Sequence, residues 1–433
     1  MIITGDWVVP VLGPPIRNGA VVVRAPVIED VGPSEQMRER YPTLPVRAHP
    51  GCVIAPGLVN AHTHLALTSV ARVVGRAPFP EWLGRVAAVM RALDEDDIAA
   101  SATHGALMSV RAGVTTVGDI AYGPEVPAAA ADMGLDGVFF FEVLGIRADE
   151  LRRKLDELEY PADTEGCTHG RTVCGLSAHA PYSSGPDLIR AVYQTAQERG
   201  VPFVMHLSES DAESALLERG EGPFASLAAR LAHGFSAPGC SAVEYVRRLG
   251  ALRGTVAVHC VKVAETDIAT LAYEAAGVVV CPRSNRILGN GAPPVREMRT
   301  RGVKLALGTD SLASNDDLDL FAELRELQRL DRTIETTRLL GIATIEGASV
   351  LGIEDRVGAL TPGRCADVIA VHTGPTDDPV AALIERGSTG SVRTVVSAGV
   401  LRVVDGRPTV LARPIENASA RVAEKAARAL RES

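Results

Sequence analysis

Two histidines separated by one residue, His62 and His64, give the strongest local signal for chemistry in this sequence. They end an apolar run, IAPGLVNAHTHL, that is typical of a buried strand. Side chains at i and i+2 of a strand share a face, so both imidazoles can meet one cation. An H-x-H pair also occurs in strands without any ligand role. The metal hypothesis therefore depends on which other ligands the fold brings to these two.

A third histidine and an aspartate end two later apolar runs. His206 lies in VPFVMHLSE and Asp310 in VKLALGTDS. Three imidazoles and a carboxylate suit a single Zn²⁺, with Fe²⁺ as the alternative, and leave positions open for water. Taken singly, His206 could be a core histidine and Asp310 a helix N-cap. If both runs open on the same rim as His62 and His64, the four residues form one metal site.

Two further residues stand where proton transfer would need them. Glu209 follows His206 by three residues and leaves the strand for the loop, a position that suits a proton carrier beside the metal. His259 ends the run TVAVHC and could orient or polarise a metal-activated water. The alternatives are an exposed loop glutamate and a core histidine.

Eight apolar runs between residues 56 and 355 alternate with helix-period segments, as in β/α units around a parallel sheet. The pattern predicts an α/β fold, a (β/α)₈ TIM barrel, whose active site lies at the carboxyl ends of the strands. Crossover helices are predicted over Asp94–Arg111, Pro186–Arg199, Glu265–Ala276 and Leu318–Leu330. The runs end near His64, Ile120, Gly145, Ala180, Glu209, Cys260, Asn285 and Ser311.

The two ends of the chain share a different texture, with half-buried strand patterns broken by Gly and Pro. Residues 1–55 and 356–415 are therefore predicted to form one small β-sandwich module, and 56–355 the barrel. An amphipathic stretch, Ala418–Leu430, predicts a C-terminal helix within 416–433 that packs on the surface.

Composition excludes several classes of partner. The net charge is −9, whereas binding to a phosphate backbone needs clustered Lys and Arg, so no nucleic-acid partner is expected. No apolar run reaches the ~20 residues that span a bilayer, and the N-terminus lacks a signal-peptide pattern. The seven cysteines are scattered without a C-x-x-C pair, which favours reduced thiols. We expect no membrane association and a cytoplasmic location.

Several longer blocks resemble one enzyme superfamily. PGLVNAHTHL, HLSES, VAVHC and LGTDSLASNDDLDLF are similar to the amidohydrolase superfamily, in the branch of adenosine, S-adenosylhomocysteine and aminofutalosine deaminases and the chlorohydrolase-like enzymes. VGALTPGRCADVIAV resembles the C-terminal β module of that branch. FPEWL, FFFEVLG, GLSAHAPYSS and CPRSNRILGNGAPPV most resemble 6-amino-6-deoxyfutalosine deaminases of the alternative menaquinone pathway.

The resemblance implies roles for individual residues. It matches His62, His64, His206 and Asp310 to the metal ligands, and Glu209 and His259 to the catalytic pair at the activated water. His179 matches a histidine that approaches the purine, and Glu81 an acidic residue that binds ribose hydroxyls. Trp82 beside it is either a substrate contact or a core aromatic under the rim.

One departure and one absence refine the resemblance. Aminofutalosine deaminases often carry a carboxylate soon after the second metal histidine, where this chain has Leu65-Ala66-Leu67-Thr68, so a substrate contact differs. The fourth predicted strand, TVCGLSAHA, contains no lysine that could be carbamylated to bridge two metals. We expect one metal ion.

The hypothesis is therefore a metal-dependent hydrolytic deaminase of an amino-purine nucleoside, with 6-amino-6-deoxyfutalosine first and adenosine or S-adenosylhomocysteine next. Asp310 accepts the water proton, hydroxide attacks the amino-bearing carbon, and Glu209 protonates the adjacent ring nitrogen. Arg147 and Arg283, beyond the third and seventh strands, either pair with a substrate carboxylate or form ordinary salt bridges. A homodimer is expected.

Two other functions fit the same residues. One is a chlorohydrolase or aminohydrolase acting on a triazine, guanine or cytosine-type heterocycle at the same metal. The other, of a different class, is a barrel scaffold that has lost its metal. Because all four ligand positions are filled, the sequence favours an enzyme over the scaffold.

Overall fold

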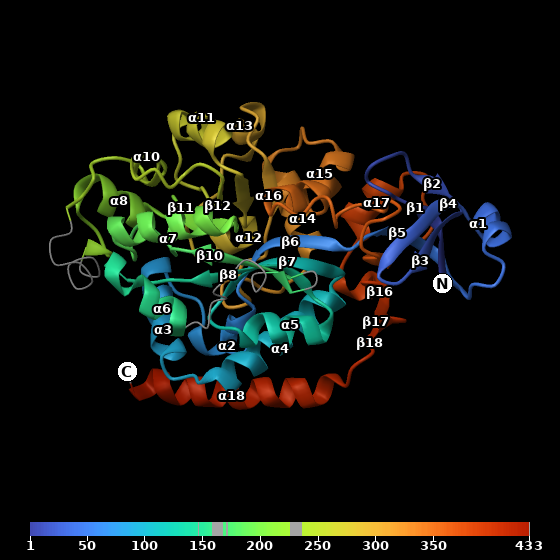
Figure 1. The fold of residues 1–433 in the computed structure, drawn as a ribbon, viewed down its shortest axis with the longest axis horizontal. Helices are drawn as coiled ribbons and strands as arrows, with labels where there is room; N and C mark the ends of the chain where they lie inside the picture. The colour runs from blue at the N-terminus through green and yellow to red at the C-terminus, as the bar shows by residue number, and fades with distance from the viewer. Residues whose placement is uncertain (146, 158–167, 170–171, 226–235, 433) are drawn as a thin grey trace.

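The computed structural model of the chain describes residues 1–145, 147–157, 168–169, 172–225 and 236–432. A parallel sheet surrounded by helices forms the centre of the molecule, a second sheet lies at one end, and a long helix runs along one side (Figure 1).

The central sheet is the predicted barrel. Its eight parallel strands follow one another in chain order, and all eight coincide with the predicted runs. A bridge between Thr63 and Asp310 joins the last strand region to the first, so the ring is nearly closed. A two-residue strand, β9 (Thr168–His169), pairs outside this ring with β10. The barrel strands are β6 (Leu58–Thr63), β7 (Val114–Ala121), β8 (Asp136–Glu142), β10 (Thr172–Ser177), β11 (Phe203–Leu207), β12 (Thr255–His259), β13 (Gly277–Val280) and β14 (Leu305–Leu307).

The crossover helices begin and end where capping chemistry places them. Helix α4 (Glu95–Arg111) starts at a capping box formed by Asp94 and Asp97. Helix α7 (Pro186–Arg199) has proline at its first position and ends at Gly200, whose φ of 63° is left-handed. The other predicted crossovers are α11 (Glu265–Glu274) and α14 (Leu320–Leu330).

Shorter helices fill the remaining connections. They are α2 (Ala71–Val74), α3 (Phe79–Met90), α5 (Glu125–Met133), α6 (Leu151–Glu157), α8 (Asp211–Arg219), α10 (Ala242–Arg248), α12 (Pro282–Ile287), α13 (Val295–Thr300), α15 (Thr336–Ile342), α16 (Ile345–Val350) and α17 (Pro379–Arg386). The predicted seventh run, GVVVCPRSN, is strand only to Val280 and then turns into α12 at Pro282, because proline suits a first helical position and cannot extend a central strand.

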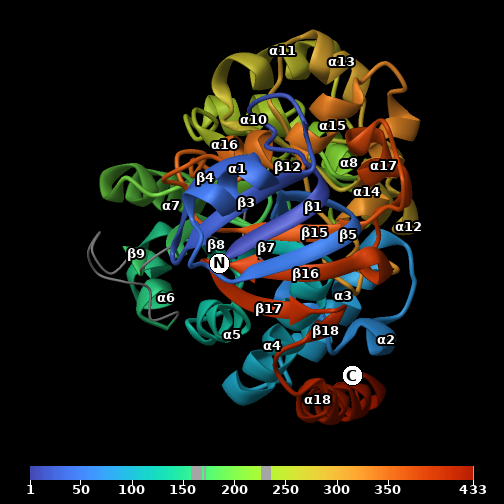
Figure 2. The same cartoon turned by 90° about the vertical axis from the view of Figure 1, so that its right-hand side faces the viewer.

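Both chain ends contribute strands to the second sheet, as predicted (Figure 2). Its strands join in one hydrogen-bonded order, β18-β17-β16-β15-β5-β1-β3-β4, with β2 paired to β1. All neighbours are antiparallel except β1 and β5. Helix α1 (Ser34–Arg40) belongs to the same part of the chain. The strands are β1 (Ile2–Val8), β2 (Ile16–Arg17), β3 (Gly19–Arg24), β4 (Val27–Pro33), β5 (Val46–Pro56), β15 (Val368–His372), β16 (Val392–Ser397), β17 (Val400–Val404) and β18 (Arg407–Pro408).

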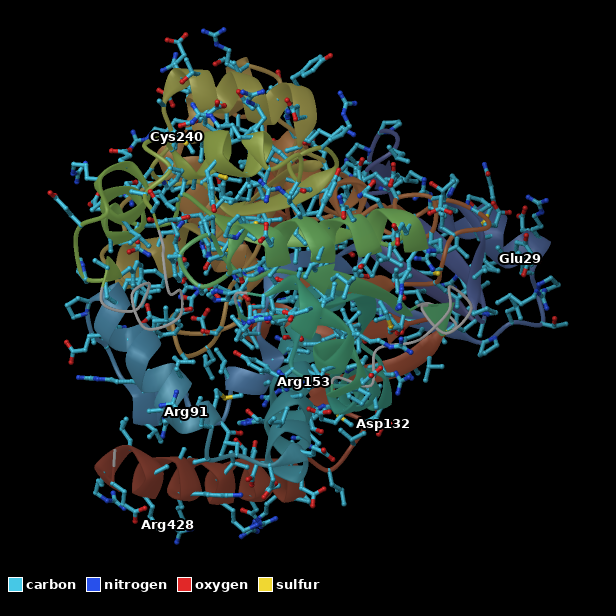
Figure 3. The ribbon with its side chains drawn as sticks, turned by 60° about the vertical axis from the view of Figure 1, so that its left-hand side comes forward. Glu29, Arg91, Asp132, Arg153, Cys240 and Arg428 are labelled. Atoms are coloured by element: carbon cyan, nitrogen blue, oxygen red, sulfur yellow. The ribbon has the colours of Figure 1, made fainter. Side chains whose placement is uncertain are left out.

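The C-terminal helix α18 (Ala412–Glu432) starts earlier than the predicted 416 and packs on α2, α3 and α4. Its inner face buries Val422, Ala426 and Ser419, and the Ser419 hydroxyl bonds to Ser69 at 2.7 Å and to His104 Nδ1 at 2.8 Å. Figure 3 shows Arg428 on the outer side of this helix, away from the barrel. The helix thus packs over the segment that carries α3.

An apolar cluster inside the ring of strands supports the site. Val138 and Phe140 of β8, Val204 of β11 and Ala306 of β14 are almost completely buried in it. Residues two positions further along a strand share the same face, so Glu142 follows Phe140 on this face of β8. The side chains at the strand ends therefore lie directly above a packed apolar cluster.

In the described part of the chain, no helix combines the length and hydropathy needed to cross a membrane.

Candidate metal centre and active site

The predicted ligands meet at the carboxyl ends of four barrel strands. His62 lies on β6, His64 follows that strand directly, His206 lies on β11 and His259 ends β12, while Asp310 comes after β14. Between 1% and 5% of the surface of His62, His206, His259 and Asp310 is exposed. Parallel strands of a barrel open on one rim, and this shared rim brings residues distant in sequence together.

Distances place the five residues around a common point. The Nε2 atoms of His62 and His64 lie 3.7 Å and 3.6 Å from Asp310 Oδ1. The candidate ligand atoms of His62, His206 and His259 lie within 4.8 Å of one another, as do those of His62, His64 and Asp310. The structure therefore brings together all four predicted ligands, and the candidate ligand atom of His259 also lies within 4.8 Å of those of His62 and His206.

Hydrogen bonds fix which ring nitrogens face inward. His206 Nδ1 donates to the backbone carbonyl of His179 at 3.1 Å, and His259 Nδ1 donates to Asn285 Oδ1 at 2.9 Å. In each ring Nε2 is then the unprotonated nitrogen. Outer partners of this kind orient metal-binding histidines. His62 Nε2 is buried without a hydrogen-bond partner among the described residues, which fits a nitrogen that binds a cation.

Burial keeps these imidazoles neutral. It lowers the pKa of His64, His206 and His259 to about 4, and the pKa of His62 falls well below its usual value because burial and three neighbouring imidazoles act together. Neutral nitrogen is the form that binds a divalent metal. The donor set of imidazoles and one carboxylate, with nitrogens already deprotonated, therefore fits a divalent metal ion.

Glu209 and Asp310 have opposite protonation tendencies. Burial raises the pKa of Glu209 well above its usual range, and the carboxylates of Asp310 and Glu213 raise it further. Burial alone would also raise the pKa of Asp310, but the facing His64 and His259 rings and the Ser284 hydroxyl hold it below its usual value. A protonated acid and an ionised base in one site are the pair that proton transfer requires.

The carboxyl groups are held in place by specific donors. Asn290 Nδ2 donates to Glu209 Oε1 at 3.1 Å, and the same oxygen lies 3.8 Å from His259 Nε2. Asp310 accepts hydrogen bonds from Ser284 Oγ at 2.6 Å and from the Ser311 amide at 2.7 Å.

The backbone is strained at the strand ends. His179, His259 and Asp310 have φ values of 51°, 73° and 58°, in the left-handed region that non-glycine residues rarely adopt. Each of these residues ends or follows a barrel strand. The left-handed turn departs from the regular alternation of the strand and sets the direction of these three side chains.

A cavity opens over these groups. His64, His206, Glu209, His259 and Asp310 line its polar side. Another part of the wall is aromatic, with the Phe79 and Trp82 ring centroids 6.2 Å apart and with Tyr182, whose ring also stacks on Phe224 with centroids 4.4 Å apart. Such a cavity can hold a flat heterocycle against the polar centre.

Among the predicted substrate contacts, Trp82 and His179 line this cavity, whereas Glu81 does not. Helix α3 presents Phe79, Trp82 and Val86 to the cavity, at i, i+3 and i+7. Glu81 therefore faces the other side, where its 57% exposed side chain pairs with Arg85 at 2.6 Å. The prediction that Glu81 lies in the substrate site does not hold in this structure.

The two predicted arginines also lie outside the cavity. Arg147 is exposed and donates to Asp149 at 2.8 Å. Arg283 is buried, but Asp317 Oδ1 accepts from it at 2.7 Å and Glu323 lies 3.8 Å away. Both side chains form salt bridges with local carboxylates, and their pairing with a substrate carboxylate stays a prediction.

Sequence reasoning missed several residues at the site. Glu142, at the end of β8, lines the cavity, and so do Tyr122 and Tyr182. Asn285 and Asn290 orient His259 and Glu209. Glu142 had a signal, since it is the one polar residue at the end of the apolar run VFFFEV. The asparagines had none, because their role depends on where α12 and its following turn lie.

The Amidohydrolase family profile matches residues 53–402 of the chain. Curated relatives named 5-methylthioadenosine/S-adenosylhomocysteine deaminase include one from Moorella thermoacetica, 30% identical over 93% of this chain and 94% of that protein. Another, from Syntrophobacter fumaroxidans, is 32% identical over 90% and 89%. The chain belongs to the amidohydrolase family. It is a hydrolytic enzyme of the metal-dependent, carbon–nitrogen bond-cleaving kind.

Solved structures agree with this fold. An adenosine deaminase from Xanthomonas campestris with bound zinc has a TM-score of 0.84 and 25% identity, covering 98% of each chain. Helicobacter pylori aminofutalosine deaminase has a TM-score of 0.78 and 22% identity over 92% and 99%, and Arthrobacter aurescens atrazine chlorohydrolase 0.78 and 20% over 98% and 99%. At these two lower identities the likeness shows the fold alone.

Proposed function

We propose that the chain hydrolytically deaminates an amino-purine nucleoside, using one divalent metal ion. The observation that carries the proposal is the placement of Glu209 and Asp310 beside four imidazoles in one cavity with a partly aromatic wall. Burial raises the pKa of Glu209, whereas at Asp310 the facing imidazoles and Ser284 outweigh burial and hold the pKa below its usual value. Deamination needs an acid for the ring nitrogen and a base for the attacking water, and the two carboxyl groups supply these.

His62, His64, His206 and Asp310 would hold the ion, which we propose to be Zn²⁺ with Fe²⁺ as the alternative. When bound there, the ion acts as a Lewis acid that makes water a nucleophile near neutral pH. The zinc in the Xanthomonas adenosine deaminase supports this choice of metal.

The chain's own residues carry the proton transfers. Asp310 takes the proton of the attacking water on a carboxylate that Ser284 and Ser311 hold in place. Glu209, positioned by Asn290, gives its proton to the ring nitrogen next to the amino-bearing carbon. His259, whose Nδ1 proton is committed to Asn285, presents Nε2 to the same point and orients the water. The amino group takes the proton that Asp310 received and leaves as ammonia, and the proton of the new hydroxyl returns to Glu209.

The names of the relatives favour 5-methylthioadenosine, S-adenosylhomocysteine and adenosine as substrates. The 6-amino-6-deoxyfutalosine substrate, with its place in menaquinone synthesis, stays a further candidate on the sequence blocks that resemble that subgroup. Trp82, Phe79 and Tyr182 would pack against the purine in each case, because the cavity wall they form is aromatic.

A substrate panel tests this function. Metal-loaded enzyme is incubated with the four nucleosides above, and with guanine and a chlorotriazine, while ammonia or chloride release is measured. We expect ammonia from at least one adenine nucleoside, and release at least about 10²-fold slower in the Glu209→Gln variant. Turnover of only guanine or the triazine would contradict the nucleoside proposal. A metal-loaded chain that acts on none of them would contradict it as well.

A further inference from the structure

A buried carboxyl group in the cavity has no role in the proton transfers above. Glu142 ends β8, where it pairs in register with Ser177 of β10, and only 8% of its surface is exposed. Its side chain lines the same cavity as Glu209 and His206. Its Oε1 atom is buried and has no hydrogen-bond partner among the described residues.

Such an atom requires an explanation. A buried polar group without a partner costs stability, and most native structures satisfy almost all of them. Burial raises the pKa of Glu142 to about 8, which shows how little its surroundings compensate the charge. Strand β8 needs no carboxyl group at this position for its packing. A partner that arrives with the substrate accounts for both observations.

His179 is a polar neighbour of Glu142 in the cavity. Its Nδ1 atom is hydrogen-bonded to the Ser183 hydroxyl. A carboxyl oxygen of Glu142 and a ring nitrogen of His179 lie within 4.8 Å of each other. Glu142 therefore faces a polar part of the cavity.

We propose that Glu142 is a specificity-determining residue that accepts a hydrogen bond from the 2′-hydroxyl of the nucleoside sugar. An adenine nucleoside brings hydrogen-bond donors on its amino group and on its sugar hydroxyls. The proposed mechanism holds the amino group at the reacting carbon, beside Glu209 and Asp310, so a sugar hydroxyl is the donor left for Glu142. The inference rests on the proposed nucleoside deaminase function.

This assignment replaces the carboxylate that the sequence suggested. Glu81 pairs with Arg85 on the outer face of α3, whereas Glu142 reaches the cavity from the barrel itself. A carboxyl group that lines the cavity can contact the bound nucleoside, whereas one on the outer face of α3 cannot. The enzyme should therefore discriminate between sugars with and without the 2′-hydroxyl.

The test compares adenosine with 2′-deoxyadenosine in wild type, Glu142→Gln and Glu142→Leu. Wild type should prefer adenosine in kcat/KM by about 10-fold to 100-fold, as expected when a buried acceptor loses its donor. Glu142→Leu should bring the ratio close to 1 by lowering kcat/KM for adenosine alone. Glu142→Gln keeps a carbonyl acceptor and should keep part of the preference. If Glu142 had a purely structural role, kcat/KM would fall equally for adenosine and 2′-deoxyadenosine in both variants.

Glu81→Gln is the matched control, because it removes a carboxylate outside the cavity and should leave the sugar preference unchanged. A preference retained in Glu142→Leu, lost in Glu81→Gln, or absent from wild type would overturn the inference. Metal content and thermal unfolding confirm that each variant is folded. The two proposals fail differently: adenosine deamination without sugar preference overturns this inference alone, whereas no deamination of any nucleoside overturns the proposed function first.

Discussion

The backbone amide of Asp310 donates to the carbonyl of His62 at 3.0 Å. This hydrogen bond joins the region after the last barrel strand to the first strand. It also sets two of the proposed metal ligands side by side, with His62 Nε2 and Asp310 Oδ1 3.7 Å apart. The contact that closes the barrel therefore also positions two of the proposed metal ligands.

Gly308 makes this close approach possible, and substituting it should disrupt both the fold and the site. A Cβ atom at residue 308 would lie 2.7 Å from the Cβ of His62 and 2.8 Å from its carbonyl oxygen. We expect Gly308→Ala to lower the free energy of unfolding by about 1–3 kcal/mol and to weaken metal binding, because the strands must move apart. Gly390→Ala, where the nearest atom is 3.9 Å away, is the control. If Gly308→Ala and Gly390→Ala have equal stability and metal content, the close approach of Gly308 to His62 is not needed for the fold or the metal site.

Replacing Glu209 by glutamine should separate metal binding from proton transfer. The amide keeps the size and the Asn290 contact but cannot donate an acidic proton. We expect turnover to fall by about 10²-fold to 10⁴-fold while the metal content stays that of wild type. Metal analysis beside steady-state kinetics measures both quantities. Near-wild-type turnover would mean that another group protonates the substrate.

The two tryptophans provide a matched pair for the cavity wall. Trp82 Nε1 donates to the Ala313 carbonyl and Trp7 Nε1 to the Thr376 carbonyl, each at 3.0 Å. Trp82→Phe and Trp7→Phe should each cost about 1–2 kcal/mol of stability through the lost hydrogen bond. Only Trp82→Phe should raise KM, because only Trp82 lines the cavity. A rise in KM in both variants would point to a general loss of stability instead.

The contact between α4 and α18 should make the fold sensitive to acid. Burial lowers the pKa of His104 below its usual 6.5, an effect that Arg111 reinforces and Glu416 opposes. The unfolded chain then binds a proton as the pH falls through 6.5, whereas the folded chain does so only at lower pH, so stability falls with pH in that window. Denaturation of wild type and His104→Gln at several pH values should show a shallower loss in the variant. If stability falls with pH equally in wild type and His104→Gln, His104 does not contribute to the acid sensitivity.

The sequence predicted the features that depend on periodicity and on strand ends. The eight strands, the sheet made from both chain ends and the convergence of His62, His64, His206 and Asp310 follow from apolar runs and from the geometry of a parallel barrel. Helix α7 even has the predicted bounds, because Pro186 and Gly200 mark its ends.

The positions of the side chains that lie elsewhere than the sequence suggested depend on helix phase and on local ion pairs. Glu81 lies next to Trp82 in sequence, yet one residue on a helix is a turn of about 100°, so the two side chains face different surroundings. Arg147 and Arg283 are satisfied by Asp149 and Asp317, and no spacing rule reveals such partners. Glu142 was overlooked although it is the one polar residue at the end of its apolar run, because the sequence does not show which groups lie beside it in the cavity.

The central claim is that His62, His64, His206 and Asp310 close around a single cation. Titrating metal-stripped protein with Zn²⁺, followed by elemental analysis after gel filtration, measures the stoichiometry directly. One tightly held ion per wild-type chain, lost when His62 is replaced by alanine, is the predicted result. A chain that retains no metal, or two ions that persist in the His62→Ala variant, would contradict it.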